Sequence, residues 1–262
     1  MSDYATDYTV DELVTASIAR NIQNGELIQQ GGNTPLAIVA VALARLTHAP
    51  RAVYNFLGSI DPLLYELDDP NFVEAGSETA LMPLEFLHAI GMALRGKIDV
   101  FTGMPAQIDQ YGNVNISLIG DPAKTRARFP GGYGIPDWIL YVRRVFFYLP
   151  RHTTQTFAER VDYITGTGHF PGGLAERRRR GIPGQGPEKI FSNIAVLGFD
   201  PETGRMRIES IHPGVSAEDL RSNTGFELLA PAEIPETEPP TREQVDLLRN
   251  RIDPKGLRKQ RF

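Results

Sequence analysis

The chain has 262 residues, of which 41% are hydrophobic and 23% charged. This length can bury a sizeable core in one large α/β domain or two small ones, and the composition is not that of a disordered protein. The net charge of −5 and the lack of a basic stripe with interleaved aromatic residues argue against nucleic-acid binding. Because cysteine is absent, disulfides, thiolate metal sites and a cysteine nucleophile are excluded.

Targeting and metal-binding signals are missing from the sequence. Residues 1–9 are polar and acidic, unlike a signal peptide. The longest apolar stretch, residues 36–46, is too short for a membrane span and contains Arg45. The histidines show no metal-ligand spacing. We therefore expect a cytoplasmic protein with no membrane contact and no metal.

In chain order, the pattern first predicts a helix that starts with a capping box at Thr9 and Glu12 and stops by Gly25. A second helix, from Pro35 to Leu46, is apolar on nearly every face, which is typical of a buried helix. Further helices are predicted at 83–94, 217–223 and 242–252. Short apolar strands are predicted at 27–30, 52–57, 98–102, 144–149, 161–165, 190–199 and 206–211.

This alternation of helices and short buried strands predicts an α/β fold, with an open, mostly parallel sheet and helices on both faces. We expect a single domain over residues 1–262, with a proline- and glutamate-rich connector at about 231–240 and a C-terminal helix at about 242–252. Ligands of such sheets bind beyond the carboxyl ends of the strands. Loops at 31–33, 58–59 and 103–112 follow strand ends.

Three segments contain residue types that could carry chemistry. In the segment 107–115, Gln107, Asn113 and Asn115 could fix a polar ligand, or they could cap a rigid turn. The backbone N–H groups of Gly131 and Gly132 could converge on an oxyanion, or the loop could be a flexible connector. The third segment, 166–186, holds four arginines that could meet phosphates or an acidic partner, or form a solvated mobile loop. His212, before Pro-Gly, is interpreted as a turn residue.

Taken together and in this order, these segments resemble the B subunit of family I CoA-transferases such as glutaconate CoA-transferase, over almost the whole chain. The most specific mark is Gln107-Ile108-Asp109 followed by Tyr111-Gly112-Asn113-Val114-Asn115. The other marks are Gly-Gly-Asn-Thr-Pro-Leu at 31–36, Ala49-Pro50, Gly58, Lys124-Thr125-Arg126, Gly131-Gly132, His212-Pro213-Gly214-Val215, Thr224-Gly225-Phe226 and Ile252-Asp253-Pro254.

The resemblance implies the open α/β fold of these subunits and a homologous A subunit, in a heterodimer or heterotetramer with a shared active site. It also implies an acyl-CoA substrate, with coenzyme A present only as part of that substrate and no permanently bound cofactor. In the transferases, a glutamate two residues before a strand-end glycine attacks the thioester. It forms an acyl anhydride and then carries CoA as a glutamyl thioester.

This sequence departs from that pattern, because Phe56 stands two residues before Gly58. The nearest carboxylates in sequence are Asp61 and Glu66. Glu74 lies outside the strand and is not proposed as the catalytic glutamate. The catalytic residue is therefore left unassigned. Since backbone N–H groups are the usual oxyanion donors, we expect Gly131 and Gly132 to stabilise an oxyanion, Gln107 and Asn113 to orient the substrate, and Ser59 to hydrogen-bond an acyl carboxylate. The predicted substrate- and CoA-binding residues are Phe56, Gly58, Ser59, Gln107, Asn113, Asn115, Gly131 and Gly132.

Three functions remain open at this point. The chain could be the B subunit of an enzyme that transfers CoA from a dicarboxylyl, branched or cyclic keto acyl group. It could instead belong to a ring-opening hydrolase or a decarboxylase of an acyl-CoA, which the missing glutamate favours. It could also be a non-catalytic scaffold that supports an active A subunit.

Overall fold

A computed structural model of the chain describes residues 3–32, 34–56, 58–62 and 78–261. The chain folds into two compact units. The first unit contains Met1–Met92, Lys97–Gly103 and Glu238–Phe262, and the second contains Ala93–Gly96 and Met104–Thr237. Whether they act as the single domain expected from the sequence stays a prediction.

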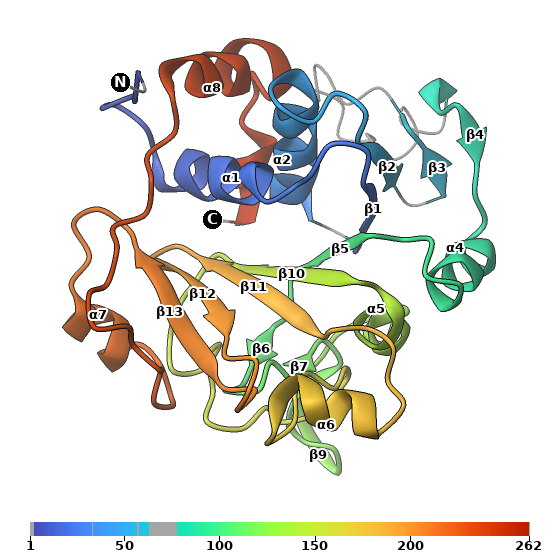
Figure 1. Cartoon of the computed structure of the whole chain (residues 1–262), viewed down its shortest axis with the longest axis vertical. Helices are drawn as coiled ribbons and strands as arrows, with labels where there is room; N and C mark the ends of the chain where they lie inside the picture. Colours follow the sequence, from blue (N-terminus) through green and yellow to red (C-terminus); the bar gives the residue numbers. More distant parts are fainter. Residues whose placement is uncertain (1–2, 33, 57, 63–77, 262) are drawn as a thin grey trace. The chain divides into compact units, whose positions relative to one another are not determined.

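The strands of the first unit follow the order β5-β1-β2-β3-β4 (Figure 1). The central strands β5 (Val100–Gly103), β1 (Leu27–Gln30) and β2 (Val53–Phe56) run parallel. The short strands β3 (Ser59–Ile60) and β4 (Met82–Pro83) continue the sheet antiparallel. The three parallel strands place their carboxyl ends at one edge, where the site described below lies.

Helices of both chain ends pack together in the first unit. Helix α1 (Val10–Arg20) begins with the predicted capping box at Thr9 and packs on the buried helix α2 (Pro35–Leu46). The C-terminal elements lie beside α2 (Figure 1). They are α8 (Arg242–Leu247), the π-helix η1 (Leu248–Ile252) and the 3₁₀ helix η2 (Leu257–Arg261).

The second unit holds a four-stranded mixed sheet in the order β10-β11-β12-β13. Strands β10 (Arg144–Leu149) and β11 (Pro187–Ser192) are parallel, while β12 (Ala195–Phe199) and β13 (Met206–Ile211) are antiparallel additions. The helices of this unit are α5 (Ile135–Tyr141), α6 (Gly173–Arg179) and α7 (Ala217–Ser222). Helix α4 (Phe86–Leu94) belongs to the first unit up to Met92.

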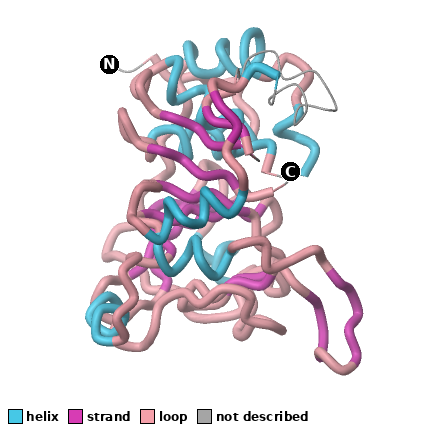
Figure 2. Tube along the Cα trace, turned by 90° about the vertical axis from the view of Figure 1, so that its right-hand side faces the viewer, coloured by secondary structure: helices cyan, strands magenta, loops and turns pink. Residues whose placement is uncertain are grey.

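Two short hairpins complete the second unit. One pairs β6 (Gln107–Ile108) with β7 (Val114–Asn115). The other pairs β8 (Leu118–Asp121) with β9 (Lys124–Arg128) and extends outward as a two-stranded arm (Figure 2).

The predicted α/β class is confirmed, and three element predictions need correction. The segment 161–165 is not a strand, because its amides bond to Val114 and to the Gln107 side chain rather than to a ladder. The apolar run 190–199 is two strands, since the Ser192 hydroxyl accepts from the N–H groups that follow it and so closes a turn. The helix predicted from 83 begins at Phe86.

Candidate functional site

Three side chains from three neighbouring parallel strands stand in a row at the carboxyl edge of the first unit's sheet. Gln30, the last residue of β1, lies opposite Thr102 of β5. Gln29 lies opposite Asn55 of β2, so the next residues, Gln30 and Phe56, project from the same face. The row therefore reads Thr102, Gln30, Phe56, and carboxyl ends of parallel strands are where α/β sheets bind ligands.

Two polar atoms of this row are buried without a hydrogen-bond partner among the described residues. Gln30 and Thr102 are each 2% exposed. The Gln30 amide donates to the Thr34 carbonyl at 3.2 Å, but Gln30 Oε1 and Thr102 Oγ1 find no partner in the described part of the chain. Because buried polar groups in native proteins are nearly always paired, two such atoms in one row mark a place for a polar ligand.

The opposite face of the same strand ends carries a pair of hydrogen-bonded amide side chains. Asn55 donates its amide hydrogen to Gln29 Oε1, and the Gln29 amide donates to the Gln30 carbonyl at 2.8 Å. This pair ties β1 to β2 directly behind the row. It fixes the backbone that presents Gln30 and Phe56.

Phe56, Gly58 and Ser59 occupy the β2–β3 turn beside the row. Phe56 is buried and its ring lies parallel to Tyr54, with centroids 6.1 Å apart. Gly58 has φ +97°, which favours glycine, and its carbonyl accepts from Leu84 N–H at 2.8 Å. Ser59 is buried opposite Phe56. These three predicted residues therefore lie together at the β2–β3 turn. The ring of Phe56 has no nucleophilic atom.

The nearest carboxylate in sequence is held by an arginine. Asp61 forms a two-pronged ion pair with Arg45 of the buried helix α2, with a second contact of 3.3 Å. Glu66 and Glu74 lie outside the described residues. Asp61 is therefore engaged in packing β3 against α2.

The amides predicted in the segment 107–115 are bonded within the second unit. Gln107 and Asn115 face each other in the β6–β7 register, and Asn115 donates to Gln107 Oε1 at 2.7 Å. The same Gln107 oxygen accepts from Asp162 N–H at 3.0 Å. Asn113 accepts from Gly168 N–H at 2.9 Å and donates to Asp109 Oδ2 at 2.8 Å.

Asp109 is the centre of this turn. Its Oδ1 accepts from the backbone N–H groups of Tyr111 and Asn113 at 2.9 and 3.0 Å. Burial raises the pKa of Asp109 above its usual range although these hydrogen bonds oppose the shift. The contacts favour the rigid-turn interpretation, and the predicted binding role of these amides stays a prediction.

Gly131 and Gly132 lie in the turn between β9 and α5. A Cβ on Gly131 would overlap the Ile116 carbonyl oxygen, so only glycine allows this close approach. Gly132 has φ +90°, and its carbonyl accepts from Ile135 N–H at the start of α5. Both glycines have a packing role, and the oxyanion role predicted for them stays a prediction.

The arginine-rich segment is more ordered than a solvated loop. Arg177 is 1% exposed and donates to the carbonyls of Gly168, Gly184 and Ile139. Arg179 and Arg180 pair with Glu176 on helix α6. Arg177 is therefore a structural residue that cannot reach a phosphate.

The sequence interpretation missed a buried histidine network in the second unit. The His152 ring contacts the hydroxyls of Ser192 (2.9 Å) and Thr224 (3.0 Å) and stacks on Phe157. Burial, and then the nearby His212, lowers the pKa of His152 to about 3. His212, which the sequence predicted as a turn residue, is also buried, and burial lowers its pKa to about 4. Only coordinates reveal this network, because its members are far apart in sequence.

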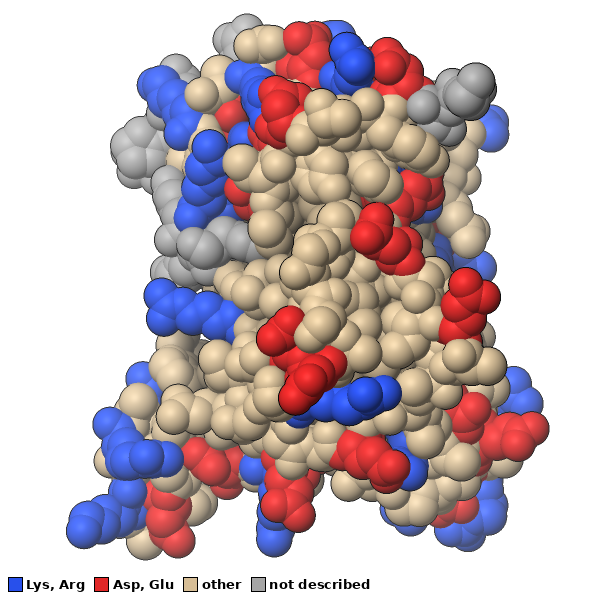
Figure 3. Space-filling model, turned by 90° about the vertical axis from the view of Figure 1, so that its left-hand side faces the viewer, with Lys and Arg blue, Asp and Glu red and all other residues tan. Residues whose placement is uncertain are grey.

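Within the described ranges, no group of histidine, aspartate and glutamate side chains could hold a metal ion. No helix in the same ranges has the length and apolarity needed to cross a bilayer. On the face drawn in Figure 3, basic and acidic side chains lie near one another around a broad uncharged area. That face shows no continuous basic field.

Comparison with known proteins places these features in context. Residues 12–223 match the family model of coenzyme A transferase. The chain is 31% identical to the B subunit of 3-oxoadipate CoA-transferase from Pseudomonas knackmussii, with 92% of each chain covered. It is 32% identical to the B subunit of glutaconate CoA-transferase from Acidaminococcus fermentans, over 97% of this chain and 96% of the relative.

Relatives named for other reactions are similar as well. The chain is 27% identical to the IpdB subunit of a cholesterol ring-cleaving hydrolase of Rhodococcus jostii, with 98% of each chain covered. Among solved structures, the decarboxylase AibA/AibB matches with a TM-score of 0.83 and 28% identity, over 96% of this chain and 98% of that one. The glutaconate CoA-transferase structure matches with the same score and identity.

Proposed function

Because this chain belongs to the coenzyme A transferase family, we propose that it is the B subunit of a two-subunit enzyme acting on an acyl-CoA thioester. The relatives that support this are themselves named as B subunits and match over nearly their full length. A homologous A subunit completes the active site at the strand ends of the first unit.

The reaction we propose is hydrolysis or decarboxylation of the acyl-CoA rather than transfer through a glutamyl thioester of this chain. The observation that carries this proposal is the uncharged row of Thr102, Gln30 and Phe56 at the carboxyl edge of the sheet. Phe56 stands where the resemblance to the transferases implies the attacking glutamate, and a phenyl ring cannot act as that nucleophile. The hydrolase and decarboxylase names among the relatives agree with this choice.

The row has the chemistry for such a reaction. A hydroxyl buried away from water can donate to a thioester oxyanion or enolate as charge develops there. Gln30 Oε1 can accept from a hydroxyl or a protonated acid on the substrate, since its own amide hydrogen is already donated to Thr34. The Phe56 ring offers an apolar wall for a branched or cyclic acyl group.

The test uses the complex of this chain with its A subunit. We expect acyl-CoA consumption without an acceptor acid, and no glutamyl thioester on this chain that hydroxylamine or borohydride can trap. Phe56→Ala should weaken acyl-CoA affinity. Consumption that depends on an acceptor acid, together with trapping on this chain, would contradict the proposal.

CoA transfer remains a second candidate because relatives more than 30% identical to this chain are named transferase subunits. In that case the A subunit supplies the nucleophile, and trapping occurs there with an acceptor acid present. If substitutions at Thr102 and Gln30 leave all turnover unchanged, the chain acts only as a scaffold.

A further inference from the structure

The segment that follows the last strand of the first unit's sheet exposes several large apolar side chains together. Strand β4 ends the strand order of this sheet and leads into helix α4 (Figure 1). Leu81 is 78% exposed and Leu87 is 76% exposed. Met82 is 52% exposed and Phe86 is 42% exposed. These four side chains, here called the β4–α4 patch, lie within seven residues, and a cluster of this kind marks an interaction surface.

Helix α4 directs a small side chain inward and a large one outward. Ala89 is 2% exposed, whereas Leu87, two residues earlier, projects from the opposite side of the helix into solvent. His88 is the one polar side chain of this helix. A surface helix normally turns its large apolar residues to the core and polar residues to water, and a helix that is apolar on every face is normally buried. The pattern of α4 is therefore typical of a helix whose outer face is covered by another protein.

The edge of the sheet beside α4 favours packing of side chains over addition of a strand. Strand β4 pairs with β3 on one side, and no strand among the described residues pairs with its other side. It is only two residues long and contains Pro83, and short edges with proline resist the addition of a further strand. An occupant of this edge would therefore pack on the exposed side chains of Leu81 and Met82.

The patch is connected to the candidate site through the β2–β3 turn. Ser59 pairs with Phe56 of β2 and with Pro83 of β4. Leu84 N–H, between the strand and the helix of the patch, donates to the Gly58 carbonyl at 2.8 Å. A protein that packs on the patch therefore lies next to the turn that holds Phe56, at the end of the uncharged row.

We propose that the β4–α4 patch is a docking surface for the A subunit. This inference rests on the proposed function, because it assigns the surface that receives the partner which that function requires. The relatives are named as B subunits, and a partner of different sequence is the occupant that such names imply. Interfaces have an apolar centre enriched in aromatic residues and methionine, with a polar rim. The patch supplies that centre, and the exposed Glu85 and His88 supply part of a rim.

A second copy of this chain explains less of the arrangement. Contact between two copies would bring the same surface against itself. It would therefore add no chemical group to the strand-end row that this chain does not already hold. A contact between copies is kept as an outcome of the test.

The test follows dissociation of the complex of the full chain with its A subunit on dilution, by mass photometry and by turnover. Leu87→Glu and Met82→Glu should each raise the dissociation constant for the A subunit at least about tenfold, because each would bury a carboxylate in an apolar contact. Turnover of both variants should approach that of the unaltered complex as the concentration rises.

Two further variants guard the interpretation. Leu87→Ala, which suits an exposed helix position, should raise the dissociation constant at least about threefold, and it keeps the test valid if a glutamate variant does not fold. Val10→Glu changes another exposed apolar residue of the first unit, at the start of α1, and should leave the dissociation constant unchanged.

Unchanged dissociation constants in Leu87→Glu, Met82→Glu and Leu87→Ala would overturn the inference. Loss of contacts between copies of this chain, with the A subunit still bound as tightly, would also overturn it and assign the patch to those contacts. A lower urea midpoint of the variants without weaker subunit binding would show that the patch packs within the chain, and would overturn it too. If the unaltered chain forms no complex with an A subunit, the proposed function itself fails and this inference fails with it.

Discussion

The unpaired polar atoms of Thr102 and Gln30 allow a role in function to be distinguished from a role in stability. The Thr102 hydroxyl is buried without a partner among the described residues, so it contributes nothing to folding and carries a desolvation cost. Thr34, equally buried, donates its hydroxyl to the Gly31 carbonyl at 2.8 Å. Thr102 in β5 and Thr34 at the N-cap of α2 therefore form a matched pair of buried threonines, one unpaired and one paired.

Replacing each threonine by valine should give opposite results. Thr102→Val should leave the free energy of unfolding unchanged or raise it by up to about 1 kcal/mol, and should lower turnover of the complex by about a hundredfold. Thr34→Val should lower the free energy of unfolding by about 1 kcal/mol. Urea denaturation and steady-state kinetics measure the two quantities. Normal turnover in Thr102→Val would remove Thr102 from the active site.

His152 should make stability depend on pH. Its pKa is about 3 in the folded state, where burial disfavours the charged ring, against 6.5 when exposed. The unfolded chain binds the proton more readily, so this contribution is complete above pH 6.5 and is lost as pH falls toward 3. We expect a slope of about 1.4 kcal/mol per pH unit from His152, with a similar term from His212. Urea denaturation of the unaltered chain and of His152→Gln between pH 8 and 4.5 measures this slope of the free energy of unfolding. Equal slopes in the two chains would show that His152 is not the source of the pH dependence.

At the scale of elements, the turn of the β6–β7 hairpin distinguishes two roles for the segment 107–115, which are ligand binding and stabilisation of the fold. Asn113 bridges Asp109 and Gly168, so Asn113→Ala should lower the free energy of unfolding by about 1–3 kcal/mol. At a temperature where the variant is folded, the KM for acyl-CoA should not change. A raised KM with full stability would instead establish the binding role predicted from the sequence.

Elements with a strong internal pattern could be predicted, and those defined by distant partners could not. Pro35–Leu46 and Arg144–Leu149 match their predicted bounds because a nearly continuous apolar run favours one buried element. The β8–β9 hairpin was missed, since β8 is short and β9 is mostly polar and wholly exposed. Short segments such as 161–165 look like strands until their amides find side-chain acceptors.

The candidate site follows the same rule. Phe56, Gly58 and Ser59 could be placed from one strand and its turn. Gln30 and Thr102 could not, because each belongs to a separate strand and only the register brings them beside Phe56. A polar residue closing an apolar strand was the one signal available.

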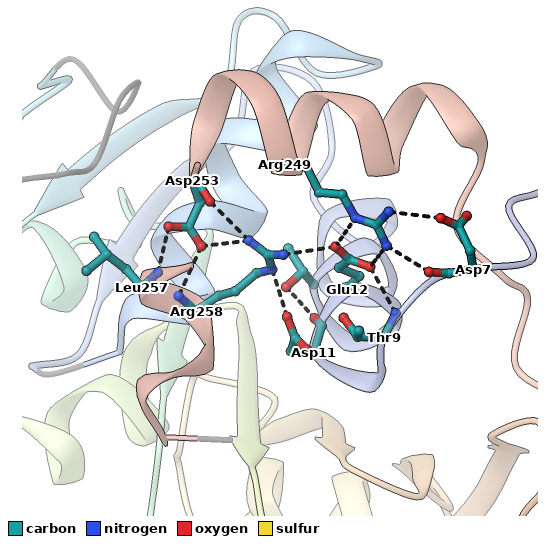
Figure 4. A network of polar contacts seen from close by, with 9 residues as sticks. Asp7, Thr9, Asp11, Glu12, Arg249, Asp253, Leu257 and Arg258 are labelled. Carbon is teal, nitrogen blue, oxygen red and sulfur yellow. Dashed lines mark hydrogen bonds and ion pairs between the residues drawn. The ribbon is translucent and has the colours of Figure 1, made fainter. Parts of the chain in front are cut away.

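At the scale of the whole molecule, the two chain ends close the first unit around an ionic network (Figure 4). Arg258, 2% exposed, contacts Asp11, Glu12 and Asp253 at 2.7–2.9 Å. Arg249 adds a second contact to Glu12 at 2.8 Å. Burial alone would raise the pKa of Glu12, but the hydrogen bonds from Arg249 and Thr9 and the arginine charges lower it to about 2.

Arg258→Ala should therefore lower the free energy of unfolding by about 3–5 kcal/mol, because it leaves buried carboxylates without their cation. Arg178→Ala, an exposed control, should change it by less than about 0.5 kcal/mol. The folded-state pKa of Glu12 is depressed, so its contribution is complete above pH 4.5 and is lost as pH falls toward 2. The difference in the free energy of unfolding between the unaltered chain and Arg258→Ala should become smaller over that pH range. The contributions of the histidines are the same in both chains and cancel in this difference. A difference that is small at pH 7, or that stays constant down to pH 2, would show that packing of η2 rather than charge holds the two ends together.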